Sequence, residues 1–216
     1  MKKKSRRGLS VIGGADGPTS IIIAGKSGKQ PLRIRIKNAI YRHKRRKAAG
    51  TIIAHAHTLS DVVQYAMLHY EAKEANPNQR NYIEQQKNLK ESLILRYKPE
   101  LLGEMSSIPF PDSSNEESAR DYIGRIRNRS KMIAEMPDDI IPMDYHLYEI
   151  EIDDNCLEIE IEHTWNIFAV SYSGDKKAMR QFQKISKDLY TYYGVSENDI
   201  RNKTERYKAL LAVLSS

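Results

Sequence analysis

The chain has 216 residues, a formal net charge of +7 and a single cysteine, Cys156. A chain of this length can bury a sizeable core and form one domain or two small ones. One cysteine excludes an intramolecular disulfide, and this favours a reducing, cytoplasmic setting. No stretch approaches the roughly twenty apolar residues of a membrane-spanning helix, and the basic start leads into glycines rather than the apolar region of a signal peptide.

Charge is distributed unevenly along the chain. Residues 1–50 hold fifteen Lys and Arg residues against one acid, Asp16, whereas the remainder holds twenty basic and twenty-seven acidic residues. A basic segment of this density is typical of proteins that bind a polyanion. We therefore expect residues 1–50 to contact an anionic membrane surface or another polyanion.

The first expected elements are a β-hairpin and a basic helix. The hairpin has strands at residues 9–12 and 19–24, joined by a glycine-rich turn. The helix begins at Leu32, carries Ile36 and Ile40 on the same stripe, and ends before Gly50. Its basic residues are the candidate contacts for the anionic partner: Arg33, Lys37, Arg42, Lys44, Arg45, Arg46 and Lys47.

The hairpin carries the clearest motif of the chain, because residues 9–25 read LSVIGGADGPTSIIIAG. This segment resembles the GGADGPT signature of the β subunit of sodium ion-translocating decarboxylases, of the oxaloacetate and methylmalonyl-CoA decarboxylase type. In that family the segment lies in the membrane, and its aspartate takes part in sodium binding and translocation. The resemblance implies a sodium site at Asp16, Gly13, Gly14, Gly17, Thr19 and Ser20. The alternative is a turn in which the glycines adopt positive φ and Asp16 accepts backbone hydrogen bonds.

The middle of the chain is expected to be helical. A short strand at residues 51–57 precedes a helix over 61–73, with Thr58 or Ser60 as its N-cap. A second helix carries apolar residues at helical spacing from Tyr82 to Tyr97 and ends at Pro99. We divide the chain into a basic segment at 1–50, a helical region at 51–99, a linker or loop at 100–115 and an α+β domain at 116–216.

The last hundred residues carry the clearest strand signal. After a helix over 116–136, two strands alternate between apolar and acidic residues on either side of a turn at Asp154-Asn155. Residues 164–172 are apolar on both faces, which predicts a central or well-covered strand. A helix over 176–193 follows, and Ser196 with Asp199 forms a capping pair for a final helix.

The acidic residues of the two alternating strands are expected to project from one face of the sheet. They are Glu149, Glu151, Glu158, Glu160 and Glu162. This face is either a solvated surface or the contact for a basic partner, which includes the chain's own basic helix and that of a second copy. Self-association through this face is therefore one of the expected interactions.

No catalytic group of residues can be assembled from the sequence. Cys156 lies beside Asp153, Asp154 and Glu158, and neighbouring carboxylates raise the pKa of a thiol and make it a poor nucleophile. His55 and His57 have a spacing found in metal sites, but no third ligand is identifiable near them. We therefore expect no metal site and no cofactor other than the sodium ion that the resemblance implies.

These observations predict an α+β protein with a basic N-terminal β-hairpin and helix, a helical middle, and a C-terminal three-stranded antiparallel sheet with two packing helices. The expected function is that of a soluble, non-catalytic binding or accessory protein, cytoplasmic and peripheral to the inner face of the membrane. The alternative is a component related to the pump's β subunit, involved in sodium ion transport. Sequence-specific recognition of nucleic acid is not expected, because Tyr41 is the one aromatic residue of the basic helix.

Overall fold

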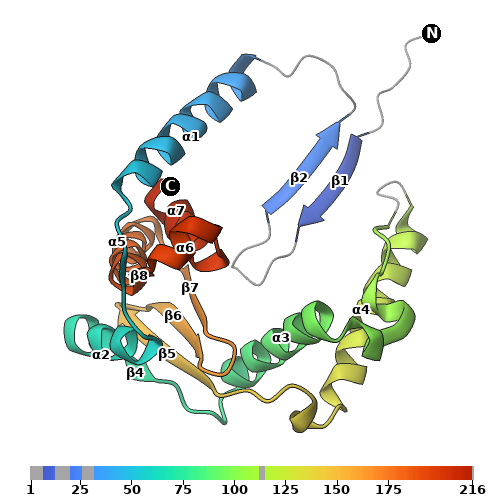
Figure 1. Cartoon of the computed structure of the whole chain (residues 1–216). Helices are drawn as coiled ribbons and strands as arrows, with labels where there is room; N and C mark the ends of the chain where they lie inside the picture. The colour runs from blue at the N-terminus through green and yellow to red at the C-terminus, as the bar shows by residue number, and fades with distance from the viewer. Residues whose placement is uncertain (1–6, 13–19, 26–31, 112–114, 216) are drawn as a thin grey trace. The chain divides into compact units, whose positions relative to one another are not determined.

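The structure is a computed structural model, and it describes residues 7–12, 20–25, 32–111 and 115–215. It has a mixed α+β architecture, as the sequence predicts. The chain divides into two compact units that each combine segments distant in sequence. The first comprises Met1–Lys26, Ala75–Tyr145 and Glu162–Trp165, and the second Ser27–Glu74, His146–Ile161 and Asn166–Ser216. Figure 1 labels most of the helices and strands of both units.

The N-terminal hairpin is present in the first unit. Strand β1 (Arg7–Ile12) pairs antiparallel with β2 (Ser20–Gly25), and Leu9 lies opposite Ile23. Both strands lie close to the predicted ranges, which confirms the strand pattern on either side of the motif. The expected turn at residues 13–18 lies outside the described residues.

The remainder of the first unit is helical. Helix α3 (Arg80–Tyr97) matches its prediction and is followed by the 3-10 helix η1 (Pro99–Ser106), by α4 (Glu116–Ala134) and by the short 3-10 helix η2 (Asp138–Ile140). The segment predicted as a linker therefore begins with helical turns, which bury Leu102. Proline at the first position of η1 is compatible with a helical start, because that position needs no amide hydrogen.

Lys90 of α3 and Lys98, the residue that directly follows this helix, hold the segment after α4. The Lys90 amine donates to the Met136 carbonyl and pairs with the Asp138 carboxylate, both at 2.8 Å. The Lys98 amine donates to the Ile140 carbonyl at 2.6 Å. Ile141, which follows directly, is 1% exposed. Both the lysine contacts and the burial of Ile141 therefore hold this segment in place.

The second unit is built on the sheet. Strands β5 (Tyr145–Ile152), β6 (Asn155–Glu162) and β7 (Ile167–Ser173) form the predicted antiparallel set, and the two-residue β4 (Lys73–Glu74) adds a fourth strand beside β5. The strand order is β4-β5-β6-β7, so β7 lies at an edge, and of the two predicted alternatives, a central or a well-covered strand, the central one is wrong. Its apolar character comes from residues such as Phe168, which join the core.

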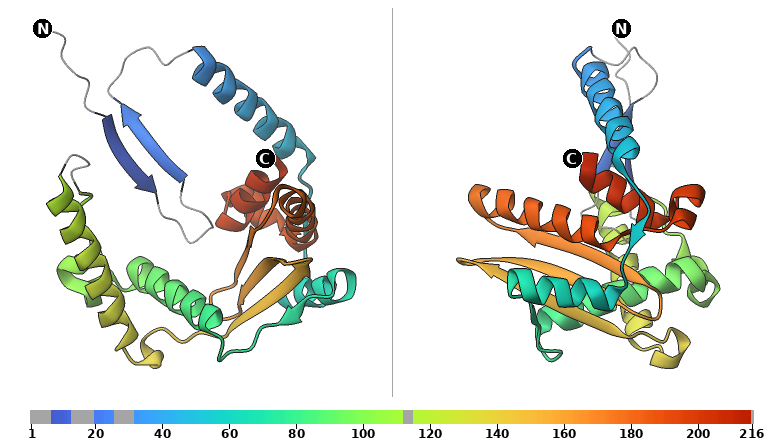
Figure 2. Two further views of the ribbon diagram at one scale, coloured as in Figure 1. Left: turned by 180° about the vertical axis from the view of Figure 1, so that it is seen from behind. Right: turned by 60° about the vertical axis from the view of Figure 1, so that its left-hand side comes forward.

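Helices α2 (Leu59–Tyr70) and α5 (Lys176–Tyr193) share one hydrophobic core with the sheet (Figure 2). The core combines Val62 and Ala66 of α2 with Phe182 and Leu189 of α5 and with alternate residues of the strands. The apolar residues that alternate along the strands and those at helical spacing on α2 and α5 therefore pack into the same core. A Thr58–Asp61 capping box begins α2, which confirms Thr58 as its N-cap.

The chain ends in two helices rather than the single one expected. Ser196 and Asp199 form the predicted capping box, which starts α6 (Glu197–Asn202). The chain then turns at Lys203, whose φ is 49°, and continues as α7 (Glu205–Ser215). Left-handed φ values stop a helix, so one predicted helix becomes two short ones.

Arg206 of α7 joins two backbone segments of the second unit, one at His57 and one at Tyr193-Gly194. Its guanidinium donates to the carbonyl oxygens of Gly194, His57 and Tyr193, and it stacks over the Tyr193 ring at 3.5 Å. The same part of the chain forms a small sheet, in which the short strand β3 (His55–Ala56), just before His57, pairs with β8 (Gly194–Val195). One side chain therefore links α7 to both strands of this small sheet.

Replacing Arg206 by Lys should destabilise the second unit by about 2 kcal/mol, because an ammonium group cannot donate to three separated carbonyls and stack on the ring at once. Thermal unfolding followed by circular dichroism would measure the loss. The matched variant Arg201→Lys changes an exposed side chain of α6 and should leave the midpoint unchanged. Equal midpoints for both variants would contradict the role assigned to Arg206.

Position 194 requires glycine because the backbone of β3 lies very close to it. Its φ is 60°, and a Cβ at this position would overlap the carbonyl oxygen of His55. Gly194→Ala should therefore destabilise the protein by about 2–4 kcal/mol, since both the conformation and the contact are unfavourable. Gly124→Ala is the control, because Gly124 lies within α4 with open space around it and alanine should stabilise that helix by about 0.5–1 kcal/mol. Denaturant unfolding curves would report both changes.

Candidate functional site

The basic helix is the most exposed helix in the described part of the chain. Helix α1 (Leu32–Thr51) begins at the predicted residue and continues two residues beyond the predicted end. Every residue from Leu32 to Lys44 is exposed. A helix that neither buries a face nor forms stabilising pairs is unusual on its own in a globular protein, so this exposure makes α1 a candidate interaction surface.

The helix carries eight cations and no carboxylate. All seven predicted contact residues lie on it, and seven of its eight cations are exposed, with Arg45 half-buried. Arg35 is the eighth cation and was missing from the predicted contact residues. The run of basic residues in the sequence was a sufficient signal to include it. None of the eight forms an ion pair with a carboxylate among the residues that the structure describes.

The hydrogen bonds of these cations stay within the helix. Arg42 donates to the Asn38 carbonyl and Arg45 to the Tyr41 hydroxyl, both at 3.3 Å. Neither bond neutralises charge. The positive charge of α1 is therefore balanced by solvent ions and is available to a polyanion.

The C-terminal end of α1 is anchored in the second unit. Ala48 is buried, and α1 packs against α7. The Thr51 hydroxyl donates to the Ala48 carbonyl at 2.8 Å in the last turn. One end of the helix is thus held while the basic residues before it stay in solvent.

The residues that resemble the decarboxylase signature lie almost wholly outside the described part. Gly13, Gly14, Asp16, Gly17 and Thr19 fall in the range that the structure does not describe. Ser20 is the first residue of β2 and lies opposite Ile12. The sodium site therefore stays a prediction.

Four of the five predicted acidic residues lie together on one sheet face. Glu149 and Glu151 of β5 alternate with core residues, as do Glu158 and Glu160 of β6. Burial, then Glu158 and Glu151, raise the pKa of Glu149. The acidic face has a local basic neighbour, because Lys73 of β4 lies opposite Glu149 in the sheet.

Glu162 is not part of the acidic face. It is fully buried in the first unit, where its carboxylate accepts backbone hydrogen bonds from Asp144, Thr164 and Trp165. Three donors converge on it because the chain turns sharply after β6. A buried carboxylate is retained when such donors replace its hydration, so Glu162 stabilises a turn instead of contacting a partner.

Cys156 is half-buried on β6, near the carboxylates of the acidic face. Burial, followed by the charges of Glu149, Glu158 and Glu151, raises the pKa of its thiol to about 11. The thiol therefore stays protonated at neutral pH, as the sequence predicted from the neighbouring carboxylates.

The two histidines of the H-x-H pair lie in a cluster of rings. The His55 and His57 rings meet edge to face at 4.5 Å, and His57 stacks on Tyr192 at 3.9 Å. The Nδ1 atom of His57 lies 2.6 Å from the Tyr192 carbonyl oxygen, so this nitrogen donates a hydrogen bond and is unavailable to a metal. The carboxylate of Asp61, four residues after His57, is held by Thr58 in the capping box, whose hydrogen bonds lower its pKa.

The sequence did not reveal the polar centre beside these rings. The hydroxyls of Tyr65 and Tyr70 on α2 both donate to one oxygen of Asp188 on α5, at 2.8 and 2.7 Å. The Tyr65 ring stacks on Tyr192 at 4.0 Å and contacts the His69 ring in a tilted arrangement at 4.2 Å. No short-range sequence pattern could pair α2 with α5, because the two tyrosines and Asp188 are more than a hundred residues apart in the sequence.

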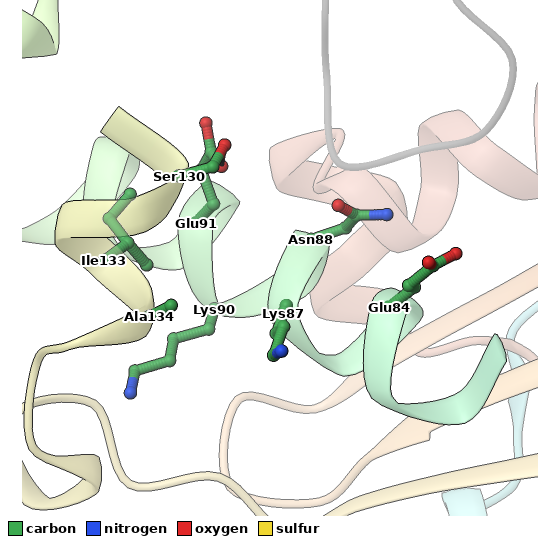
Figure 3. Close-up of a pocket in the computed structure, with 8 residues that line it drawn as sticks. All are labelled: Glu84, Lys87, Asn88, Lys90, Glu91, Ser130, Ile133 and Ala134. Atoms are coloured by element: carbon green, nitrogen blue, oxygen red, sulfur yellow. Dashed lines mark hydrogen bonds between the residues drawn. The ribbon is translucent and has the colours of Figure 1, made fainter. Parts of the chain in front are cut away.

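A hollow of about 230 Å³ lies between α3 and α4 of the first unit (Figure 3). Its polar walls already have internal partners. The Glu91 carboxylate accepts from Arg129 at 2.8 Å and from Ser130 at 2.7 Å, while Lys90 is held by Met136 and Asp138. These contacts engage two of its four charged lining residues, Lys90 and Glu91, in holding the unit together, and we assign no ligand to the hollow.

Comparison of this chain with protein families, with curated proteins and with solved structures finds no match. None of the described helices is both long and apolar enough to cross a membrane. The functional interpretation therefore depends on the residues themselves.

Glu162→Gln should destabilise the protein by about 2 kcal/mol, because the new amide group would face a backbone N–H donor on one side or the other. Glu151→Gln is the matched control, since Glu151 is exposed on the same strand pair and its replacement should change stability by less than about 0.5 kcal/mol. Denaturant titration at neutral pH would compare the two. A Glu162→Gln variant as stable as the control would contradict the role of the carboxylate in this turn.

Proposed function

We propose that the protein is a non-catalytic binding or accessory protein that attaches to a polyanionic surface through helix α1. One observation carries the proposal: eight cations lie on a helix with no carboxylate, and its first thirteen residues are all exposed. Internal ion pairs would reduce this charge in a purely structural helix. Their absence among the described residues supports an external counterpart of opposite charge.

The geometry of α1 suits an extended partner. Thirteen exposed residues at 1.5 Å each give a charged rod about 20 Å long, longer than the Debye length of about 8 Å at physiological salt. A compact anion could neutralise only part of such a rod. An extended array of phosphates or other anionic groups can engage most of it and release the counterions that the helix holds.

The alternative function, sodium ion transport as a component related to the decarboxylase β subunit, rests on the motif at residues 9–25 and stays a prediction. Sodium-dependent protection of the segment around Asp16 from proteolysis, lost in Asp16→Asn, would support it. The same protection in sodium and in potassium would count against it.

Reversing three charges of α1, in Arg35→Glu, Arg42→Glu and Arg46→Glu together, should weaken binding to a polyanion at least about tenfold, because each removed cation also adds a repulsive anion. The wild-type affinity should fall steeply as salt rises, and the variant should show a shallower dependence. Fluorescence anisotropy with a labelled DNA duplex and co-sedimentation with phosphatidylglycerol vesicles would measure binding to two polyanions.

The control reverses three exposed cations elsewhere in the second unit, namely Arg180, Lys184 and Arg201. This variant has the same net charge as the α1 variant, so a general charge effect would weaken both alike. Selective loss in the α1 variant supports the proposal. Equal binding by the two variants, or no binding of the wild type to either polyanion at low salt, would refute it.

A further inference from the structure

Helix α1 exposes apolar residues as well as charge. Leu32, Ile36 and Ile40 are 69%, 52% and 55% exposed. Their spacing of four residues places them within about 80° of one another around the helix axis. They form an apolar stripe along the three N-terminal turns, and no described residue covers it.

The cations of α1 border this stripe on both sides. In helical projection, at about 100° per residue, Arg33, Lys37 and Lys44 lie along one side of the stripe and Arg35, Arg42 and Arg46 along the other. An apolar stripe between two basic rows is the pattern of helices that lie in the interface of an anionic bilayer. Long Lys and Arg side chains can then reach the headgroups while the stripe enters the acyl boundary.

A nucleic acid would satisfy only half of these groups. Its phosphates could pair with the cations, but the stripe would stay in water or face charged phosphate groups. Stacking on bases requires aromatic side chains, and Tyr41, the one aromatic residue of α1, lies on the side opposite the stripe and is held by Arg45. An anionic bilayer engages both the charge and the stripe.

We propose that the polyanion bound by α1 is an anionic lipid bilayer, into whose interface Leu32, Ile36 and Ile40 insert; this inference rests on the proposed function of α1. The helix would lie parallel to the membrane plane, with its apolar stripe at the depth of about 5–10 Å typical of interfacial helices. Packing of its C-terminal end on α7 keeps the second unit beside the surface. Attachment is then reversible and sensitive to salt and to lipid charge.

The experiment compares the full chain with the variant Leu32→Ser, Ile36→Ser, Ile40→Ser on vesicles of phosphatidylglycerol, on vesicles of phosphatidylcholine and on a DNA duplex. Partitioning of the variant to phosphatidylglycerol vesicles should fall on the order of tenfold or more, because three apolar contacts are lost while all cations remain. Its affinity for the DNA duplex should stay unchanged. The wild type should bind phosphatidylcholine vesicles far more weakly than phosphatidylglycerol vesicles.

The matched control replaces three exposed apolar residues outside the stripe by Ser: Ile34, Ile53 and Leu68, which are 46%, 77% and 80% exposed. It removes similar apolar groups and should bind vesicles as the wild type does. Unchanged circular dichroism and thermal unfolding in both variants would exclude a folding defect, and if the stripe variant unfolded, Ile36→Ser alone would be measured.

Four outcomes overturn the inference. The stripe variant could bind phosphatidylglycerol vesicles as tightly as the wild type, or the control could lose as much affinity as the stripe variant. The wild type could prefer the DNA duplex to anionic vesicles at equal salt, which would leave the polyanion-binding function standing and refute the choice of partner. Binding of the wild type to neither polyanion would refute both proposals.

Discussion

Three backbone carbonyls converge on the guanidinium of Arg206, and the second unit is organised around this contact. The carbonyls belong to His57, Tyr193 and Gly194, so the segment before α2, the end of α5 and strand β8 are joined to α7 by one side chain. Gly194 lets the β3 and β8 backbones approach closely enough for this to happen. Because α7 is also the helix that α1 packs against, the same contact supports the base of the exposed basic helix.

Separation of charge is the second constraint on this protein. Several carboxylates of the second unit lie on the sheet or in caps, as in the acidic face of Glu149, Glu151, Glu158 and Glu160 and the capping residues Asp61 and Asp199. Helix α1 has none. Folding therefore leaves the positive charge of the helix without a carboxylate partner among the described residues, and the proposed binding of an anionic surface depends on this charge. The apolar stripe between its basic rows is the reason for proposing a lipid bilayer as that surface.

Local patterns in the sequence predicted much of the fold. Alternation of apolar and acidic residues located β5 and β6, and helical spacing located α3 and α5. Of the two N-cap candidates for α2, Thr58 was confirmed, and the pair Ser196–Asp199 was confirmed as a capping box. These features depend on residues within a few positions of each other. Where a pattern was ambiguous, as in the apolar strand β7, the sequence could not distinguish a central strand from an edge strand whose residues fill a core.

The basic character of α1, the helical spacing of Leu32, Ile36 and Ile40 and the lack of carboxylates in the helix follow from the order of residues alone, because charge and helical period are local properties. Whether that stripe would be buried in a core or left in solvent could not be deduced, since burial depends on which distant elements pack together. Long-range packing likewise placed Glu162 in a buried turn instead of on the acidic face, added β4 to the sheet, and joined Tyr65 and Tyr70 to Asp188. The physical reason is the same in each case: a side chain's polarity is set by its own chemistry, but its environment is set by residues far away in the chain.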